Sequence, residues 1–165
     1  MNPLNLNHLN VKAPYSVWEA GKQDYGFKTD YGVLYRIVFI DDQTIWENGA
    51  YEFAILNENN RPSPNDWKVR QTVFAIIEEF FASNPDILLY QCETGDSRQS
   101  IRDRLFLHWF KEYEHHADYV VRVSEIIAEG ISNYAAIIVQ RSNPALESIL
   151  LDFDNFVGFF RNKPE

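Results

Sequence analysis

Hydrophobic and polar positions repeat with two different periods along the chain, and these periods predict its strands and helices. Runs of β-branched and aromatic residues in which side chains alternate between two faces are typical of strands. The loops between them contain Gly, Pro, Asn or Asp, which favour turns. The predicted strand segments are residues 15–19, 25–29, 33–40, 50–56, 86–93, 119–127 and 134–140.

Apolar residues at a spacing of three and four predict three helices. The first begins after residue 63 or 65 and is stopped by residues 83–85, the second spans residues 96–114, and the third spans residues 144–160. Ser63 or Asn65 is expected to cap the first of them. Its apolar half-wheel includes Trp67, and its polar half includes Glu78 and Glu79. We expect the polar half to face solvent.

Together these elements predict a single α+β domain with an antiparallel or mixed sheet of about six strands and three helices. Their order along the chain is βββ(β)-α-β-α-β-β-α. Residues 1–14 are rich in Asn and are expected to form a flexible N-terminal arm. The domain then spans residues 15–160, and residues 161–165 form a polar tail.

Composition narrows the class of protein. The chain of 165 residues is 45% hydrophobic and contains one cysteine, which excludes an internal disulfide and favours the cytoplasm. Residues 1–15 hold no apolar segment typical of a secretory signal, and no apolar run reaches the roughly 20 residues needed to span a bilayer. We therefore expect neither secretion nor a membrane. The net charge of −9 disfavours binding to nucleic acid.

Residues 88–110 carry the strongest candidate chemistry: a strand, a glycine turn and a helix capped by Asp96. At 100° per residue, Arg98 and Arg102 fall within the apolar arc of this helix, whereas Arg104 faces away from it. An arginine on a core-facing stripe is costly unless it is paired. The arc is formed by Ile101, Leu105, Phe106, Trp109, Phe110 and Tyr113.

Two interpretations of these arginines stay open. They pair with Glu93, Asp96 or Glu52 and stabilise the junction, or they bind a phosphate or carboxylate at the carboxyl end of the strand. In the second case the helix dipole also favours the anion, and the glycine lets the backbone approach it. The candidate anion or partner site consists of Glu93, Thr94, Gly95, Asp96, Arg98 and Arg102.

The other candidate residues are weaker. Cys92 lies within a strand, where a lone cysteine usually packs as a small hydrophobic residue. His108, at the edge of the apolar arc, is expected to be a hydrogen-bonded packing residue. His115 and His116 are adjacent on a connector and lack a third ligand at helical spacing. We expect no metal and no cofactor, and no phosphate-loop or dinucleotide motif is present.

The run Tyr90-x-Cys92-Glu93-x-x-Asp96-x-Arg98-Gln99-x-x-Arg102-x-Arg104-Leu105-Phe106-x-x-Trp109-Phe110 resembles the signature of a small family of uncharacterised bacterial proteins, a domain of unknown function. Its members carry a Tyr-x-Cys-Asp/Glu strand followed by an Arg-rich Leu-Phe-x-x-Trp-Phe helix. The resemblance covers about 20 residues, with Glu93 in place of the expected Asp. It implies a cytoplasmic bacterial protein and no particular activity.

The sequence therefore favours a non-catalytic binding or interaction protein, whose partner is an unknown protein or a small anion. The alternative is an enzyme that acts on a phosphorylated or nucleotide substrate. In that case the arginines hold the anion, and Glu93, Asp96 or His108 supplies acid–base chemistry. Exposure distinguishes the two, because an enzyme requires the arginines to line an open cleft. The oligomeric state stays open.

Overall fold

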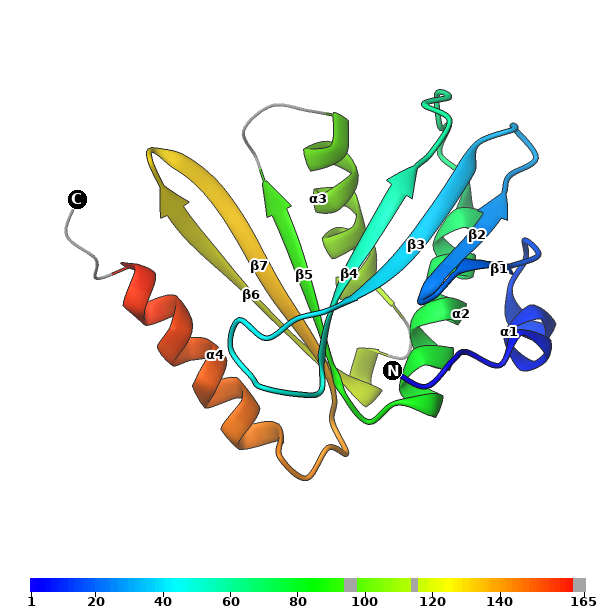
Figure 1. Cartoon of the computed structure of the whole chain (residues 1–165). Helices are drawn as coiled ribbons and strands as arrows, with labels where there is room; N and C mark the ends of the chain where they lie inside the picture. The colour runs from blue at the N-terminus through cyan, green and yellow to red at the C-terminus, as the bar shows by residue number, and fades with distance from the viewer. Residues whose placement is uncertain (94–97, 114–115, 162–165) are drawn as a thin grey trace. The chain divides into compact units, whose positions relative to one another are not determined.

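The computed structural model describes residues 1–93, 98–113 and 116–161, without the side chains of residues 92, 93, 98–103 and 128 (Figure 1). This described part holds seven strands and four α-helices. The α+β class and the mixed sheet are confirmed, whereas the count of about six strands and three helices is corrected. The unexpected helix is α1 (Leu6–Lys12), which lies in the segment that was expected to be a flexible arm.

The strands pair in the order β1-β2-β3-β4-β5-β7-β6. β4 and β5 run parallel, whereas the pairs β1–β2, β2–β3, β5–β7 and β6–β7 are antiparallel. A parallel pair cannot be joined by a hairpin, and helix α2 lies between β4 and β5 in the chain. The strands are β1 (Trp18–Gly21), β2 (Asp24–Lys28), β3 (Leu34–Asp41), β4 (Ala50–Asn57), β5 (Ile87–Glu93), β6 (Tyr119–Ala128) and β7 (Ile131–Gln140).

Contacts divide the chain into two compact units. The first unit comprises residues 1–40 and 53–85, and the second comprises residues 41–52 and 86–165. The expected division into an arm, one domain and a tail stays a prediction. None of the helices within the described residues is long and apolar enough to cross a lipid bilayer.

The first unit has a core of aromatic side chains. Every second residue of β3 is buried, because successive side chains of a strand point to opposite faces. Phe39 of β3 stacks on Phe80 with ring centroids 5.1 Å apart and also contacts Phe53 at 5.5 Å. Phe27 contacts Tyr35 at 5.3 Å. These large rings join the strands to helix α2 (Trp67–Ser83).

Helix α1 covers part of α2 and changes which residues of α2 are buried. Glu79 is only 5% exposed and forms an ion pair with His8 of α1, Nδ1 to Oε2 at 2.5 Å. Trp67, which was expected in the apolar half-wheel, is 65% exposed. Both expectations were wrong. Glu79 is buried because α1 packs beside it, and Trp67 is exposed at the first position of α2. The N-cap of α2 is Asp66, not Ser63 or Asn65.

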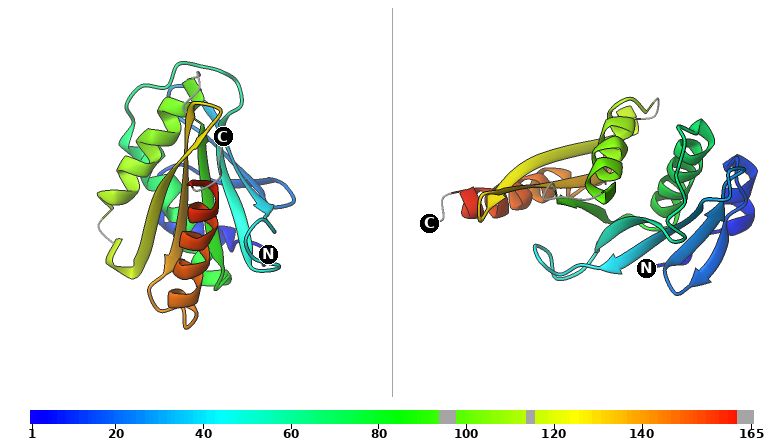
Figure 2. Two further views of the ribbon diagram at one scale, coloured as in Figure 1. Left: turned by 90° about the vertical axis from the view of Figure 1, so that its left-hand side faces the viewer. Right: turned by 90° about the horizontal axis from the view of Figure 1, so that it is seen from above.

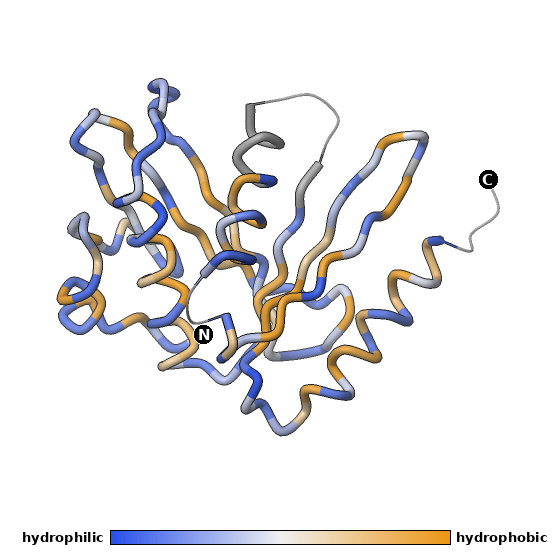
Figure 3. The backbone as a smooth tube through the Cα atoms, turned by 180° about the vertical axis from the view of Figure 1, so that it is seen from behind, coloured by the Kyte–Doolittle hydropathy of each residue, from blue (hydrophilic) through white to orange (hydrophobic). Residues whose placement is uncertain are grey.

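In the second unit, helices α3 (Arg98–Lys111) and α4 (Leu146–Arg161) pack on opposite faces of β5 and β7 (Figure 2). On one face, Tyr90 of β5 contacts Phe106 of α3 with ring centroids 4.6 Å apart. On the other face, Leu89 of β5 lies in a core with Ile149 and Phe153 of α4. Figure 3 shows apolar and polar residues alternating along α4, as expected for a helix with one buried face.

The β6–β7 hairpin is tighter than expected from the sequence. The strands predicted at residues 119–127 and 134–140 leave a longer loop between them, whereas Ala128 pairs with Ile131 and only two residues form the turn. Glu129 and Gly130 both have positive φ, at 52° and 75°. Two consecutive residues with positive φ form a type I′ turn, whose twist matches that of the flanking strands. The two strands are therefore ten residues long each.

Candidate functional site

The predicted anion site lies largely outside the described residues. β5 ends at Glu93 and α3 begins at Arg98, so the expected strand is followed by the expected helix. Thr94, Gly95 and Asp96 lie outside the described residues, and so do the side chains of Glu93, Arg98 and Arg102. The site therefore stays a prediction.

Glu52, one of the carboxylates proposed to pair with the arginines, lies on the other side of the sheet from α3. Glu52 of β4 is the register partner of Leu89, so the two side chains share the face that α4 covers. α3 instead packs on the face of Tyr90. Burial raises the pKa of Glu52 above its ordinary value, with a smaller contribution from the charge of Asp42.

The described turns of α3 show a narrower buried stripe than the sequence predicts. Phe106, Phe110 and Tyr113 are buried, whereas Leu105 is 42% exposed. His108 was expected to pack, and this was wrong. Its side chain is 63% exposed and forms an ion pair with Glu112 one turn along, at 3.4 Å. His108 therefore lies on the solvent side of the helix.

The candidate metal ligands are not brought together within the described residues. His116 lies exposed in a short 3-10 helix, whereas His115 and the side chain of Cys92 lie outside the described part. No group of three or more His, Cys, Asp or Glu side chains in the described residues could hold a metal ion. The expectation that the protein has no metal site stays a prediction.

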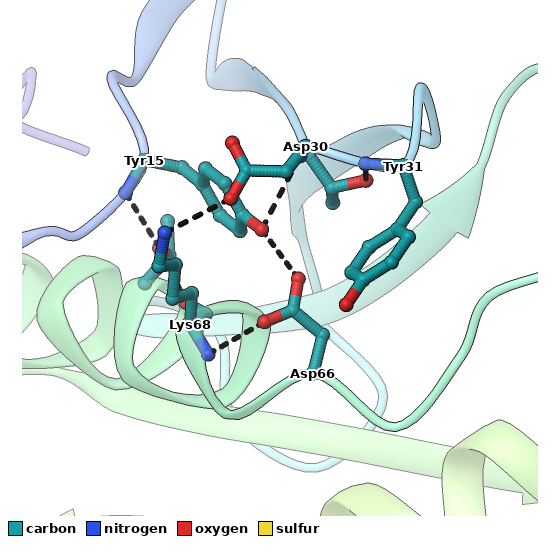
Figure 4. A network of polar contacts seen from close by, with 7 residues as sticks. Tyr15, Asp30, Tyr31, Asp66 and Lys68 are labelled. Atoms are coloured by element: carbon teal, nitrogen blue, oxygen red, sulfur yellow. Dashed lines mark hydrogen bonds and ion pairs between the residues drawn. The ribbon is translucent and has the colours of Figure 1, made fainter.

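A polar network in the first unit joins the start of α2 to two other segments (Figure 4). The hydroxyl of Tyr15 donates to Asp66 Oδ2 at 2.5 Å and accepts from the backbone N–H of Asp30 at 3.3 Å. Asp66 Oδ1 accepts from the backbone N–H of Lys68 at 3.0 Å. Lys68 Nζ in turn forms an ion pair with Asp30 Oδ2 at 2.9 Å.

This network stabilises the fold and offers no reactive group. Burial raises the pKa of Tyr15 to about 12, with a further contribution from its hydrogen bond to Asp66. The phenol therefore stays protonated at neutral pH and acts as a donor. Asp66 caps α2, and Lys68 also lies over the ring of Tyr15, 5.6 Å from its centroid. Each charged group thus has a structural role.

The second unit ends in an unusually open strand. β6 is the last strand in the pairing order, and β7 is its only neighbour within the described residues. The outward-facing N–H and C=O groups of such an edge can pair with another strand. One of them, the carbonyl of Glu125, accepts a long hydrogen bond from Arg161 of α4 at 3.5 Å. β6 is ten residues long and contains three valines and two isoleucines, which favour extended structure.

Apolar side chains are exposed next to this edge. Ile127 at the end of β6 is 66% exposed, and Ile131 at the start of β7 is 45% exposed. Phe159 and Phe160 at the end of α4 are also exposed, and their rings contact each other at 5.6 Å. Ile131 pairs with Ala128 and Ile127 with Ser132, so the two isoleucines point to opposite faces of the hairpin. The adjacent rings of Phe159 and Phe160 form an exposed apolar pair, and such grouped residues are typical of interaction surfaces.

Sequence reasoning missed this edge. The period of two within residues 119–127 identifies a strand, but it does not say which strand is last in the sheet. Because β7 inserts between β5 and β6, the edge strand precedes its neighbour in the chain. The one available signal was the polar spacing of Arg122 and Glu125 in an otherwise apolar run.

The fold and this edge define a small α+β chain with a mixed sheet and one long open edge strand. The chain belongs to a family of unknown function (DUF6169), and the family model matches residues 65–155. That match spans α2 to most of α4 and includes the whole of β6. A domain of unknown function is thus confirmed, whereas the signature motif and the bacterial origin stay predictions. No curated protein matches the sequence.

Proposed function

We propose that this protein is a non-catalytic interaction protein that binds its partner by adding a strand to β6. The single observation that carries this proposal is the open edge of β6, ten residues long and bordered by exposed apolar side chains. Strand addition supplies backbone hydrogen bonds along the whole edge, and neighbouring side chains supply specificity. The single cysteine supports a cytoplasmic location, as expected from the sequence.

The partner that fits this edge is a second copy of the chain. β6 holds one positive and one negative residue, Arg122 and Glu125, so it is locally neutral in a chain with a net charge of −9. Antiparallel pairing about a two-fold axis at Ser124 places Val121 opposite Ile127, and no like charges directly opposite each other. An axis at Val123 also avoids like pairs. Two acidic chains can therefore approach along this strand.

The oligomeric state tests the proposal. With the axis at Ser124, Val123→Asp places a carboxylate opposite Glu125 of the other copy. With the axis at Val123, it places the new carboxylate opposite the same residue of the other copy. In both registers, like charges directly opposite each other destabilise the strand pair. Val123→Asn is the matched control, because it is equally polar and similar in size but uncharged. The wild type and Val123→Asn should sediment as dimers at about 0.1 mM, well above a micromolar Kd, whereas Val123→Asp should be monomeric.

Circular dichroism of all three proteins checks that they are folded. A wild type that is monomeric at this concentration would contradict the proposal. So would a folded Val123→Asp variant that dimerises as strongly as Val123→Asn.

A second candidate function is an enzyme acting on a phosphorylated or nucleotide substrate, with an anion site at residues 93–102. The order of β5 and α3 supports it, because the start of a helix that follows a strand favours an anion. Phosphate should then raise the melting temperature more than chloride at equal ionic strength. The extra rise should be absent in Arg98→Ala and present in Arg104→Ala. Equal effects in both variants would leave the arginines with a structural role.

A further inference from the structure

The second unit contains a cavity on the α4 side of its sheet. Its volume is about 240 Å³. Leu89 and Ala135 from β5 and β7 form part of its floor, and Phe153 and Phe156 from α4 form a wall. All the residues that line it belong to the second unit, so its shape depends on that unit alone.

The loop between β3 and β4 closes one side of this cavity. Thr44 and Ile45 of the loop line the cavity directly. The next residue, Trp46, donates from Nε1 to Asp152 Oδ2 of α4 at 3.1 Å. Both Ile45 and Trp46 also pack against the apolar core of the unit. The loop is therefore held against α4 beside the cavity.

The polar groups of the cavity are neutral amides and hydroxyls. Gln91 and Asn133 lie on the same face of adjacent strands, and both line the cavity. The Asn133 amide makes one long hydrogen bond, to the carbonyl of Ile131 at 3.4 Å. Gln91 is exposed, and within the described part of the chain no hydrogen bond uses its side chain. Two primary amides can thus donate to and accept from a ligand.

The lining sets the charge of the ligand. Among the described lining residues none carries a charge, and the chain as a whole has a net charge of −9. A charged ligand would lose its hydration without gaining an ionic partner. An anion would in addition be repelled by the protein. A neutral ligand is therefore favoured.

The volume sets the size of the ligand. An apolar cavity of about 150 Å³ binds benzene, and drug-sized ligands occupy pockets of roughly 300–1,000 Å³. A cavity of about 240 Å³ lies between these limits and fits a single substituted ring or two fused rings. The ring of Phe156 is only partly buried and offers an apolar surface against which such a ring can pack, with the buried Phe153 beneath it.

We propose that this cavity binds a small neutral aromatic or heterocyclic molecule that carries an amide group. The ring packs against Phe156, and the amide exchanges hydrogen bonds with Gln91 and Asn133. This site lies on the α4 face and is independent of strand addition at β6, so either proposal can fail without the other.

Benzamide and benzoate are matched probes for the site, because they share shape and ring and differ in charge. Titrations followed by backbone amide NMR should show benzamide binding with a Kd on the order of 1 mM, as expected for a ligand of this size. The shifted signals should come from residues around Leu89 and Ala135. Benzoate should bind at least tenfold more weakly.

Two variants assign the amide contact. Gln91→Leu keeps the size of the side chain and removes its amide, so benzamide should bind at least fivefold more weakly. Gln71→Leu makes the same change at an exposed position of α2 and should leave the affinity unchanged. Equal affinities for benzamide and benzoate would overturn the proposal. Unchanged binding in Gln91→Leu would do so too, as would the absence of benzamide-dependent shifts at these residues.

Discussion

At the scale of single residues, Tyr15 shows how one buried hydroxyl connects separate segments of the first unit. It is 6% exposed and bonds to Asp66 at the start of α2 and to the backbone of Asp30. Its ring also stacks on Phe27 at 6.1 Å. Only the hydroxyl interacts with Asp66 and Asp30, so a change to phenylalanine isolates its contribution.

Tyr15→Phe should lower the free energy of unfolding by about 1.5–3 kcal/mol at pH 7, since it removes a hydrogen bond to a charged group. Urea denaturation measures this value. Tyr31→Phe is the control, because Tyr31 is 57% exposed. Comparable losses in the two variants would show that the Tyr15 hydroxyl has no special role.

The same pair of proteins gives a pH dependence. The pKa of Tyr15 is raised from 10.0 to about 12 in the folded state. The contribution of the protonated Tyr15 hydroxyl to the free energy of unfolding is therefore complete below pH 10, and it is lost as the pH rises toward 12. The difference in stability between the wild type and Tyr15→Phe should narrow over this range. A constant difference would contradict the raised pKa.

Ionisation of Glu52 should destabilise the folded chain, whereas ionisation of a carboxylate paired with a cation stabilises it. Burial raises its pKa above the ordinary value of 4.5, so its ionised form is less stable in the folded chain. Its contribution thus becomes unfavourable as the pH rises from 4.5 through the folded-state pKa. Glu52→Gln should raise the urea midpoint at pH 7, whereas Glu129→Gln in the exposed hairpin turn should not. A lower midpoint for Glu52→Gln would contradict this assignment.

At the scale of elements, the spacing of hydrophobic residues predicted the bounds of most strands and helices to within a few residues of those in the structure. It failed for α1, which has only one buried residue, Leu9, among its seven. So short a helix has little intrinsic stability, and it depends on contacts with α2 that the local sequence does not reveal. The burial of Glu79 was missed for the same reason, because its partner His8 lies on α1.

Helix α4 offers a direct test of its buried face. Phe153 is 1% exposed within the core of the second unit, whereas Phe159, six residues along the same helix, is 65% exposed. Phe153→Ala should cost about 3–5 kcal/mol of unfolding free energy, because it leaves a cavity in the core. Phe159→Ala should change it by less than about 0.5 kcal/mol. Similar losses in thermal or urea unfolding would mean that the face of α4 is wrongly assigned.

At the scale of the whole molecule, the sequence predicts the fold class but not the strand order. Adjacent strands in the chain favour a simple meander, which describes β1 to β4. The placement of β7 between β5 and β6 depends on pairing between distant residues, such as Tyr90 with Ala136. The anion site could be named from the sequence alone, because local turn and helix signals suffice for it. The edge of β6 and the cavity beneath α4 could not, since both arise from long-range pairing.

A dimer formed through β6 should make thermal stability depend on protein concentration. Mass action favours the associated state, so the melting temperature should rise with concentration for the wild type. For the folded Val123→Asp variant it should be independent of concentration. Differential scanning calorimetry over a hundredfold range of concentration tests this. Parallel behaviour of the two proteins would argue against association through β6.

The opposite end of the strand order has a consequence for how far such an assembly can grow. β1 is only four residues long, and its register with β2 is irregular between Glu19 and Gly21. A short, irregular edge is a poor template for a further strand. Two-fold pairing of β6 uses the one good edge of each copy, so no second template is left for a third chain. The protein should consequently stop at pairs and resist polymerising into fibres, even when it is concentrated.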